Sequence, residues 1–98
     1  MTIQKTLNGS TLSVTLEGRL DTTTAPLLEA ELKASMDGIT ELELDFEKLE
    51  YLSSAGLRVL LAAQKVMNKQ GKMVIRYVNE TIQEVFEITG FIDILTIE

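Results

Sequence analysis

The sequence of 98 residues contains no cysteine, no histidine and no tryptophan, and it has only one proline. Without cysteine there can be no disulfide framework, thiolate zinc site or thiol nucleophile. Without histidine the chain lacks the commonest general base and the commonest metal ligand. The phosphate-binding loops Gly-x-x-x-x-Gly-Lys-Ser/Thr and Gly-x-Gly-x-x-Gly do not occur either. We therefore expect a protein that is not an enzyme and that holds no metal and no cofactor.

Positive charge and long apolar runs are also scarce. The chain has 9 Lys and Arg residues against 15 Asp and Glu residues, so its net charge is −6. This is the wrong sign for neutralising the phosphates of nucleic acid, and it favours the approach of a basic partner surface. No apolar run reaches the roughly 20 residues of a membrane span, and no signal-peptide pattern is present. We expect a cytoplasmic protein with one domain, residues 1–98, that binds neither nucleic acid nor a membrane.

Residues 45–61 form the stretch around which the rest of the chain is organised. Residues 41–45 alternate between polar and apolar side chains, which predicts a half-buried strand, and a short loop is expected after it. From Gly56 onward the apolar residues recur every three or four positions, which predicts an amphipathic helix. Its expected inner face consists of Gly56, Val59, Leu60, Ala63, Val66 and Met67. Ser53 and Ser54 lie where the period changes. A helix N-cap belongs there, and the unpaired N–H groups of such a helix end favour an anion.

The residues before this stretch predict a hairpin and a helix. Strands at residues 2–7 and 11–17 flank Asn8-Gly9, the strongest short-range hairpin signal. A helix follows from Pro26 to about Met36, because proline is tolerated in a first helical turn. Its expected inner residues are Leu27, Leu28, Leu32 and Met36.

The residues after the stretch continue the alternation of helix and strand. The helix that starts near Ser54 is expected to run to about Lys69 and to end at Gly71 in a left-handed conformation. Residues 73–78 predict an interior strand, Asn79 caps a third helix that Gly90 ends, and residues 94–97 predict a last strand. The order β-β-α-β-α-β-α-β predicts an α/β fold with a mixed, mainly parallel sheet covered by helices.

Two segments of the chain resemble the landmarks of a known family. Residues 51–57, Tyr-Leu-Ser-Ser-Ala-Gly-Leu, and residues 18–25, Gly-Arg-Leu-Asp-Thr-Thr-Thr-Ala, resemble those of STAS domains. Within the family, the chain looks most like the stand-alone anti-sigma factor antagonists of bacteria. The resemblance implies the STAS fold and phosphorylation of the serine at the helix start, which is Ser54, with Ser53 as the second candidate. Many members have Asp-Ser-Ser-Gly here. This chain has Ser53 at the position of the aspartate and Ala55 at the position of the second serine.

The resemblance also implies a partner-switching function. In the family, the partner is both an anti-sigma factor and a serine kinase, and binding it frees a sigma factor for transcription. Phosphorylation of Ser54 would weaken the complex, and a separate serine phosphatase would restore it. The family aspartate that matches Asp21 contributes to the contact with the kinase. The alternative for Asp21 is a purely structural role as a strand-end or capping residue.

Leu57 and Leu61 lie beside the main apolar face of the expected helix, and they allow two interpretations. Either they widen the buried face, or they form an exposed apolar strip below the serine, which the partner covers. The residues expected to bind the partner are Asp21, Ser53, Ser54, Gly56, Leu57 and Leu61.

The residues are also compatible with two other classes of function. The chain could be an interaction module of a stressosome-like scaffold, or a STAS domain that binds a nucleotide or a small anion. Ser54 could also have a purely structural role, because a serine at a helix start often serves only as the N-cap. Loss of partner binding on phosphorylation would separate a switch from a scaffold, and calorimetry with nucleotides would detect a ligand-binding domain.

Overall fold

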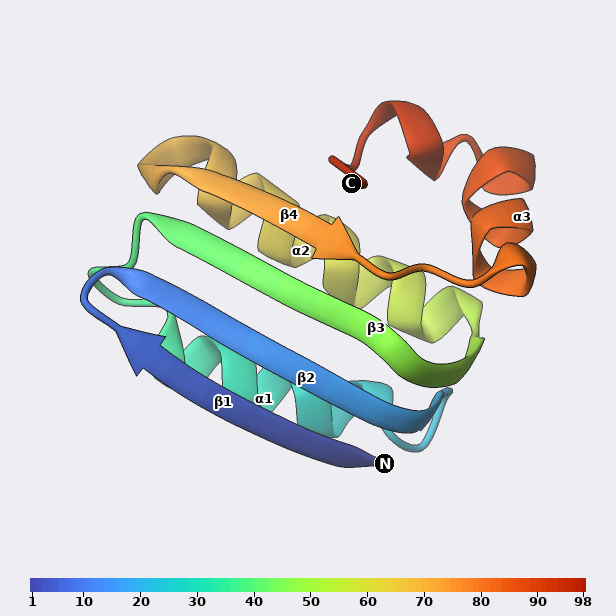
Figure 1. The fold of residues 1–98 in the computed structure, drawn as a ribbon, viewed down its shortest axis with the longest axis horizontal. Coiled ribbons are helices and arrows are strands. Elements are labelled where there is room, and N and C mark those ends of the chain that lie inside the picture. The colour runs from blue at the N-terminus through green and yellow to red at the C-terminus, as the bar shows by residue number, and fades with distance from the viewer.

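The computed structural model describes all of residues 1–98. The strands are β1 (Thr2–Asn8), β2 (Thr11–Leu20), β3 (Glu41–Leu52) and β4 (Lys72–Arg76). The helices are α1 (Ala25–Ser35), α2 (Ser54–Gln70) and α3 (Glu80–Thr89), and a short 3-10 helix, η1 (Phe91–Asp93), follows them. Figure 1 shows these elements around one sheet. None of the helices combines the length and the hydrophobicity that a membrane span requires.

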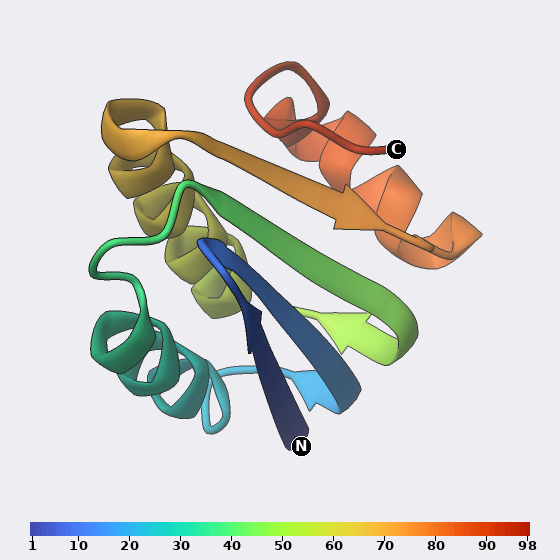
Figure 2. The same cartoon turned by 60° about the vertical axis from the view of Figure 1, so that its left-hand side comes forward.

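The four strands form one sheet in the order β1-β2-β3-β4. β1 pairs antiparallel with β2, whereas β2 with β3 and β3 with β4 pair in parallel. The prediction of a mixed, mainly parallel sheet is therefore confirmed. Helices α1 and α2 cover one face of the sheet (Figure 2), and α3 lies beyond the carboxyl end of β4 (Figure 1). A cluster of 24 buried residues fills the space between the elements, so the chain is built on one continuous core.

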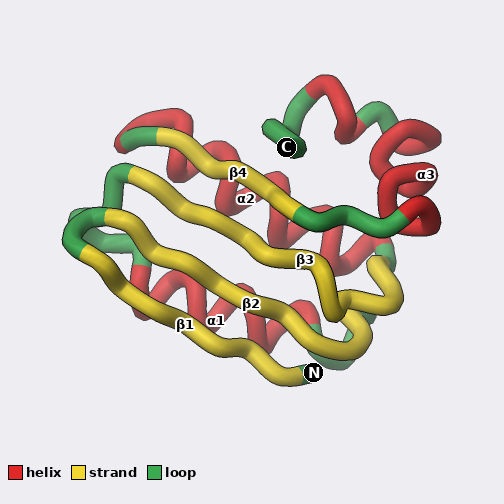
Figure 3. The backbone as a smooth tube through the Cα atoms, in the orientation of Figure 1, coloured by secondary structure: helices red, strands yellow, loops and turns green.

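β3 is longer than the sequence predicted, because the expected loop after Asp45 continues as strand. Its pairing with β2 is shifted between Thr15 and Glu17 and again between Gly18 and Arg19, so that β3 contains an extra residue at each place. Each bulge shifts the alternation of side chains by one position. Phe46, Leu49 and Leu52 are therefore all buried at intervals of three residues. Figure 3 shows the strand bending at this end.

The prediction of a last strand at residues 94–97 is wrong. Residues 91–93 form η1, and only one residue pair continues the sheet, a parallel bridge between Ile75 and Ile97. The turn that begins at Gly90 uses the N–H groups of residues 93–95 for bonds to the carbonyl oxygens of Gly90 and Phe91. These donors are consequently not available to the sheet. The observed order is β-β-α-β-α-β-α.

Three smaller expectations also fail for local reasons. Leu27 is 54% exposed, because the inner face of α1 is formed by Ala25, Leu28 and Leu32. β4 ends at Arg76, because Tyr77 adopts a φ of 62°, which an extended strand does not allow.

Gly71 ends α2 with φ 171° and not in the left-handed conformation. A Cβ atom at Gly71 would lie 1.8 Å from the carbonyl oxygen of Thr40. Glycine is therefore required at this position by the close approach of another segment, not by its own backbone angles.

Leu57 and Leu61 of α2 have different surroundings. Leu57 is 6% exposed and belongs to the core cluster, whereas Leu61 is half-buried. The interpretation of Leu57 as part of an exposed strip is therefore wrong, because the side chain widens the buried face of the helix. Val66, which we expected on the inner face, is 41% exposed.

This difference predicts unequal costs for shortening the two leucines. Leu57→Ala should lower the free energy of unfolding by about 2–5 kcal/mol, because it removes buried methyl groups and leaves a cavity. Leu61→Ala should lower it by clearly less, since part of its side chain already contacts water. Urea denaturation of both variants measures this, and equal losses would contradict the burial described above.

Candidate functional site

The two landmark segments meet at the carboxyl ends of β2 and β3. Leu20 pairs with Leu52 in the parallel register, and the N–H of Ser53 donates a hydrogen bond to the carbonyl oxygen of Leu20 at 2.9 Å. Asp21 and Ser53 each follow directly after one of these adjacent strands. The carboxyl edge of a parallel sheet is where functional side chains from successive loops come together. The fold thus brings residues about 30 positions apart in the sequence to one edge.

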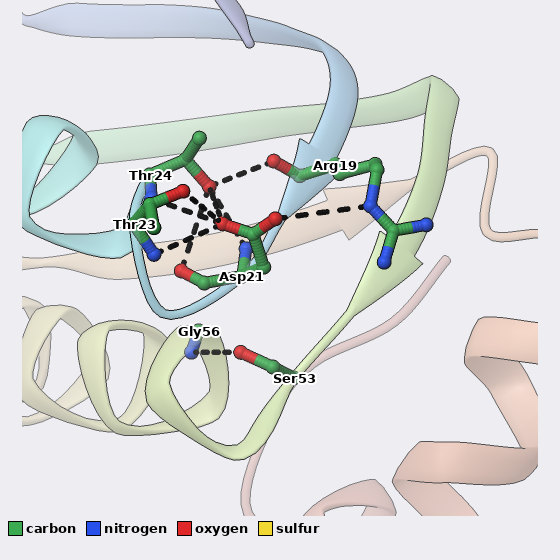
Figure 4. Close-up of polar contacts among 6 residues, drawn as sticks. All are labelled: Arg19, Asp21, Thr23, Thr24, Ser53 and Gly56. Atoms are coloured by element: carbon green, nitrogen blue, oxygen red, sulfur yellow. Dashed lines mark hydrogen bonds and ion pairs between the residues drawn. The ribbon is translucent and has the colours of Figure 1, made fainter.

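Ser53 is the N-cap residue of α2. Its backbone is extended, with φ −95° and ψ 173°, and its Oγ accepts a hydrogen bond from the N–H of Gly56 at 3.4 Å (Figure 4). Its carbonyl oxygen accepts the N–H of Leu57 at 3.0 Å, which starts the helical ladder. The hydroxyl of Ser53 is half-buried and is used to satisfy a backbone donor at the helix end.

Ser54 is the first residue of α2, and it is exposed. The alternative of Ser54 as the N-cap is wrong, because its backbone is already helical and the cap bond comes from Ser53. The hydroxyl of Ser54 has no hydrogen-bond partner within the protein. At this end of the helix, the dipole and the free N–H groups favour negative charge. Ser54 therefore combines an accessible hydroxyl with surroundings that stabilise an anion.

Asp21 lies in a tight network at the start of α1. Its Oδ1 accepts hydrogen bonds from the hydroxyl of Thr23 at 2.8 Å and from the backbone N–H groups of Thr23 and Thr24 at 3.0 and 3.1 Å (Figure 4). The hydroxyl of Thr24 accepts the N–H of Asp21 at 2.8 Å and donates to the carbonyl oxygen of Arg19 at 2.7 Å. The Thr23 hydroxyl above all, with the backbone donors, lowers the pKa of Asp21 from 3.8 to about 2. Asp21 is thus a fixed, ionised carboxylate at physiological pH.

Arg19 connects this network to the strand that leads to the serines. Its Nε lies 3.7 Å from Oδ2 of Asp21, and its guanidinium group lies 4.1 Å from the centroid of the Tyr51 ring. Tyr51 is 39% exposed, so the stacked pair forms part of the surface. Arg19 faces Tyr51 only because of the two bulges in β3, and no pattern in the sequence indicates them.

Gly56 is buried, which excludes it from direct contact with a partner. A Cβ atom at this position would lie 2.7 Å from Cγ of Leu20 and 2.7 Å from Cδ1 of Leu52. The missing side chain allows the first turn of α2 to pack closely against the ends of both strands. Of the residues expected to bind a partner, Gly56 and Leu57 are structural. Ser54 is exposed, and Asp21, Ser53 and Leu61 are half-buried.

A groove of about 210 Å³ separates the starts of α1 and α2. Its lining residues are Thr22, Ala25, Pro26, Glu29, Ala55, Arg58 and Val59. No group of three or more His, Cys, Asp or Glu side chains is arranged to hold a metal ion. The site therefore presents a free hydroxyl, an ionised carboxylate and a shallow groove, which suits recognition and modification by another protein.

Known proteins resemble this chain over nearly its whole length. The family model for the STAS domain matches residues 2–98. BtrV of Bordetella bronchiseptica, provisionally named an anti-sigma factor antagonist, is 43% identical over 84 residues, which are 84% of this chain and 72% of BtrV. The anti-sigma-B factor antagonist of Staphylococcus aureus is 31% identical over 97 residues, which are 97% of this chain and 90% of that protein.

A similar fold is present in the solved structure of the Bacillus cell fate determinant SpoIIAA in its phosphorylated form. The TM-score is 0.77 at 19% identity, and the alignment covers 99% of this chain and 91% of that one. At this identity, the similarity concerns the arrangement of helices and strands.

The network around Asp21 predicts a measurable titration. In a pH series followed by carboxyl carbon NMR, Asp21 should titrate at about 2, and Thr23→Ala should raise its pKa toward 3.8 because the strongest donor is lost. A lowered pKa stabilises the folded state above 3.8, and this contribution is lost as the pH falls toward 2. Thr22→Ala, which removes a neighbouring hydroxyl outside the network, is the control. An unchanged pKa in Thr23→Ala would contradict the assignment.

Proposed function

The chain belongs to the STAS domain family, and from this membership we propose that it is an anti-sigma factor antagonist that binds an anti-sigma factor. Binding would withhold the anti-sigma factor from its sigma factor and so permit transcription. We propose further that the anti-sigma factor is a serine kinase that phosphorylates Ser54, and that a separate phosphatase reverses the reaction. In this function, residues 1–98 act as one cytoplasmic regulatory domain with no catalytic activity of their own.

The observation that carries the proposal is the difference between the two adjacent serines. Ser53 uses its hydroxyl to cap α2, whereas the hydroxyl of Ser54 is exposed and has no partner within the protein. A kinase needs a hydroxyl that it can reach without unfolding the helix end. Ser54 meets this requirement, and SpoIIAA, whose fold is similar, has been solved in a phosphorylated form.

The mechanism of the switch follows from charge. A phosphate on Ser54 would add about −1.5 to −2 charges with strong acceptor oxygens at neutral pH. The N-terminus of α2 stabilises this charge through its dipole, so the domain stays folded. Phosphorylation instead weakens binding to the partner. The partner surface must either desolvate the phosphate or move away from its bulk. A hundredfold loss of affinity requires only about 2.7 kcal/mol, which a desolvated unpaired charge supplies.

Around Ser54, four half-buried or exposed side chains would complete the contact surface. The fixed carboxylate of Asp21 lies at the same edge of the sheet, and the Arg19–Tyr51 stack offers the residue types that dominate binding energy at interfaces. Leu61 lies two turns further along α2 and would contribute an apolar edge. We include these residues in the proposed interface, together with Ser53 at its centre.

Substitution of the serines tests the proposed modification site. Ser54→Ala should bind the partner constitutively and should not be phosphorylated. Ser53→Ala should still be phosphorylated, although the loss of the cap should lower stability by about 1 kcal/mol. Kinase assays with intact-mass analysis measure the phosphate, and binding assays measure the complex.

Capture of the partner from the native cytoplasm provides the proteins for this test. Phosphate on Ser53, or a partner that binds equally well to the phosphorylated chain, would disprove the switch. A nucleotide that binds the purified chain in calorimetry would favour a ligand-binding STAS domain in its place.

Asp21→Asn tests whether the fixed carboxylate is recognised by the kinase. The substitution keeps the shape and much of the capping capacity while it removes the charge. We expect phosphorylation of Ser54 to slow by about tenfold or more, which corresponds to one lost charged contact of about 1.4 kcal/mol. Thermal denaturation of the same variant is the control. Unchanged kinetics would leave Asp21 with only its structural role at the start of α1.

A further inference from the structure

Arg58 is the first basic residue of α2 after Ser54, four positions further along the helix. Residues with this spacing lie on the same helix face, with Cβ atoms about 5–6 Å apart. Arg58 is exposed, and it takes part in no ion pair of the structure. The guanidinium group of this long side chain can therefore reach a group that is bonded to the hydroxyl oxygen of Ser54.

No carboxylate near Arg58 pairs with it, and the other guanidinium group at this edge is already engaged. Glu29 is the only carboxylate that lines the groove beside Arg58, and it pairs with Lys33 at 3.4 Å. Arg19, the other guanidinium group at this edge, is held by the carboxylate of Asp21 and the ring of Tyr51. Arg58 is thus the only cation that lines the groove, and no carboxylate pairs with it.

We propose that Arg58 is the intramolecular counter-charge of the phosphate on Ser54. The guanidinium fork donates two N–H groups to phosphate oxygens, and an acid that precedes a base by four residues is the favourable orientation on a helix. The inference rests on the proposed function, in that it concerns a phosphate at Ser54. It adds a residue whose role no pattern of the family landmarks indicates.

This pairing would make phosphorylation change the surface in two ways. The modification adds negative charge, and it also withdraws the free guanidinium group of Arg58 from a partner. The unmodified chain presents Arg58 for contact with an acidic group, whereas the phosphorylated chain presents a neutralised pair. The phosphate is thereby held along α2 and above the groove, where Ala55 and Arg58 form one wall.

The test uses the full chain with phosphoserine installed at position 54 during translation, so that it requires no kinase. Phosphorus NMR gives the second pKa of the phosphate, which is about 6 for a free phosphoserine. Arg58→Gln should raise this pKa by about 0.3 units, the shift expected from the loss of an exposed pair of this spacing. Arg58→Lys, which keeps the charge but not the fork, should give an intermediate value.

Lys65→Gln is the matched control, because it removes the same charge from the same helix. Lys65 lies eleven residues after Ser54, about 16 Å along the axis, beyond the screening length of about 8 Å at physiological ionic strength. Its substitution should leave the pKa within about 0.1 units. The proposal would be overturned if the pKa were unchanged in Arg58→Gln, or if Arg58→Gln and Lys65→Gln shifted it equally. It would also be overturned if a third variant, Arg19→Gln, gave a larger shift than Arg58→Gln. Kinase assays on Ser54 test the proposed function separately, so either hypothesis can fail alone.

Discussion

The close contact of Gly56 with Leu20 and Leu52 is the constraint on which the rest of the site depends. The absence of a Cβ atom lets the first turn of α2 rest on the last residues of two parallel strands. The hydrogen bond from the N–H of Ser53 to the carbonyl oxygen of Leu20 holds the same junction from the polar side. Asp21 and Ser53 follow directly from the two leucines. Their positions relative to each other are therefore set by packing in the core.

The same junction divides the roles of the two serines. A helix that starts immediately after a strand needs one extended residue to turn the chain and to cap the free N–H groups. Ser53 fills this position, and it satisfies the N–H of Gly56. The next residue is necessarily helical and points its side chain outward from the first turn. The hydroxyl of Ser54 therefore remains accessible for modification. Ser53 meanwhile stabilises the helix end that carries it.

The bulges of β3 shape the surface next to the serines. They add residues between Asp45 and Leu52, and they keep Phe46, Leu49 and Leu52 in the core while the strand bends. The side chain of Asn79 donates to the carbonyl oxygen of Leu49 at 3.0 Å and also caps α3 by accepting the N–H of Ile82 at 2.9 Å. The irregular end of the strand is thus fixed by a neighbouring helix. The register that the two bulges set is what places Tyr51 beside Arg19.

The sequence by itself determined most of the fold, because periodicity and caps are local. Alternation over residues 41–45, the caps at Asn79 and Gly90 and the change of period at the serines each follow from neighbouring residues, and each agrees with the structure. The predicted hairpin also forms, but its two turn residues are Gly9 and Ser10, because Asn8 still pairs with Thr11 in the sheet. The resemblance of two short segments added the family, and it indicated Asp21 and Ser54 as site residues.

Only the tertiary structure decided which residues are accessible. The burial of Gly56 and the stack of Arg19 on Tyr51 depend on segments about 30 residues apart in the sequence. The prediction of a last strand was wrong for a related reason. The turn that begins at Gly90 uses backbone N–H groups that would otherwise bond to the sheet. Local patterns specify how each segment folds. The contacts between segments decide which side chains remain free to act.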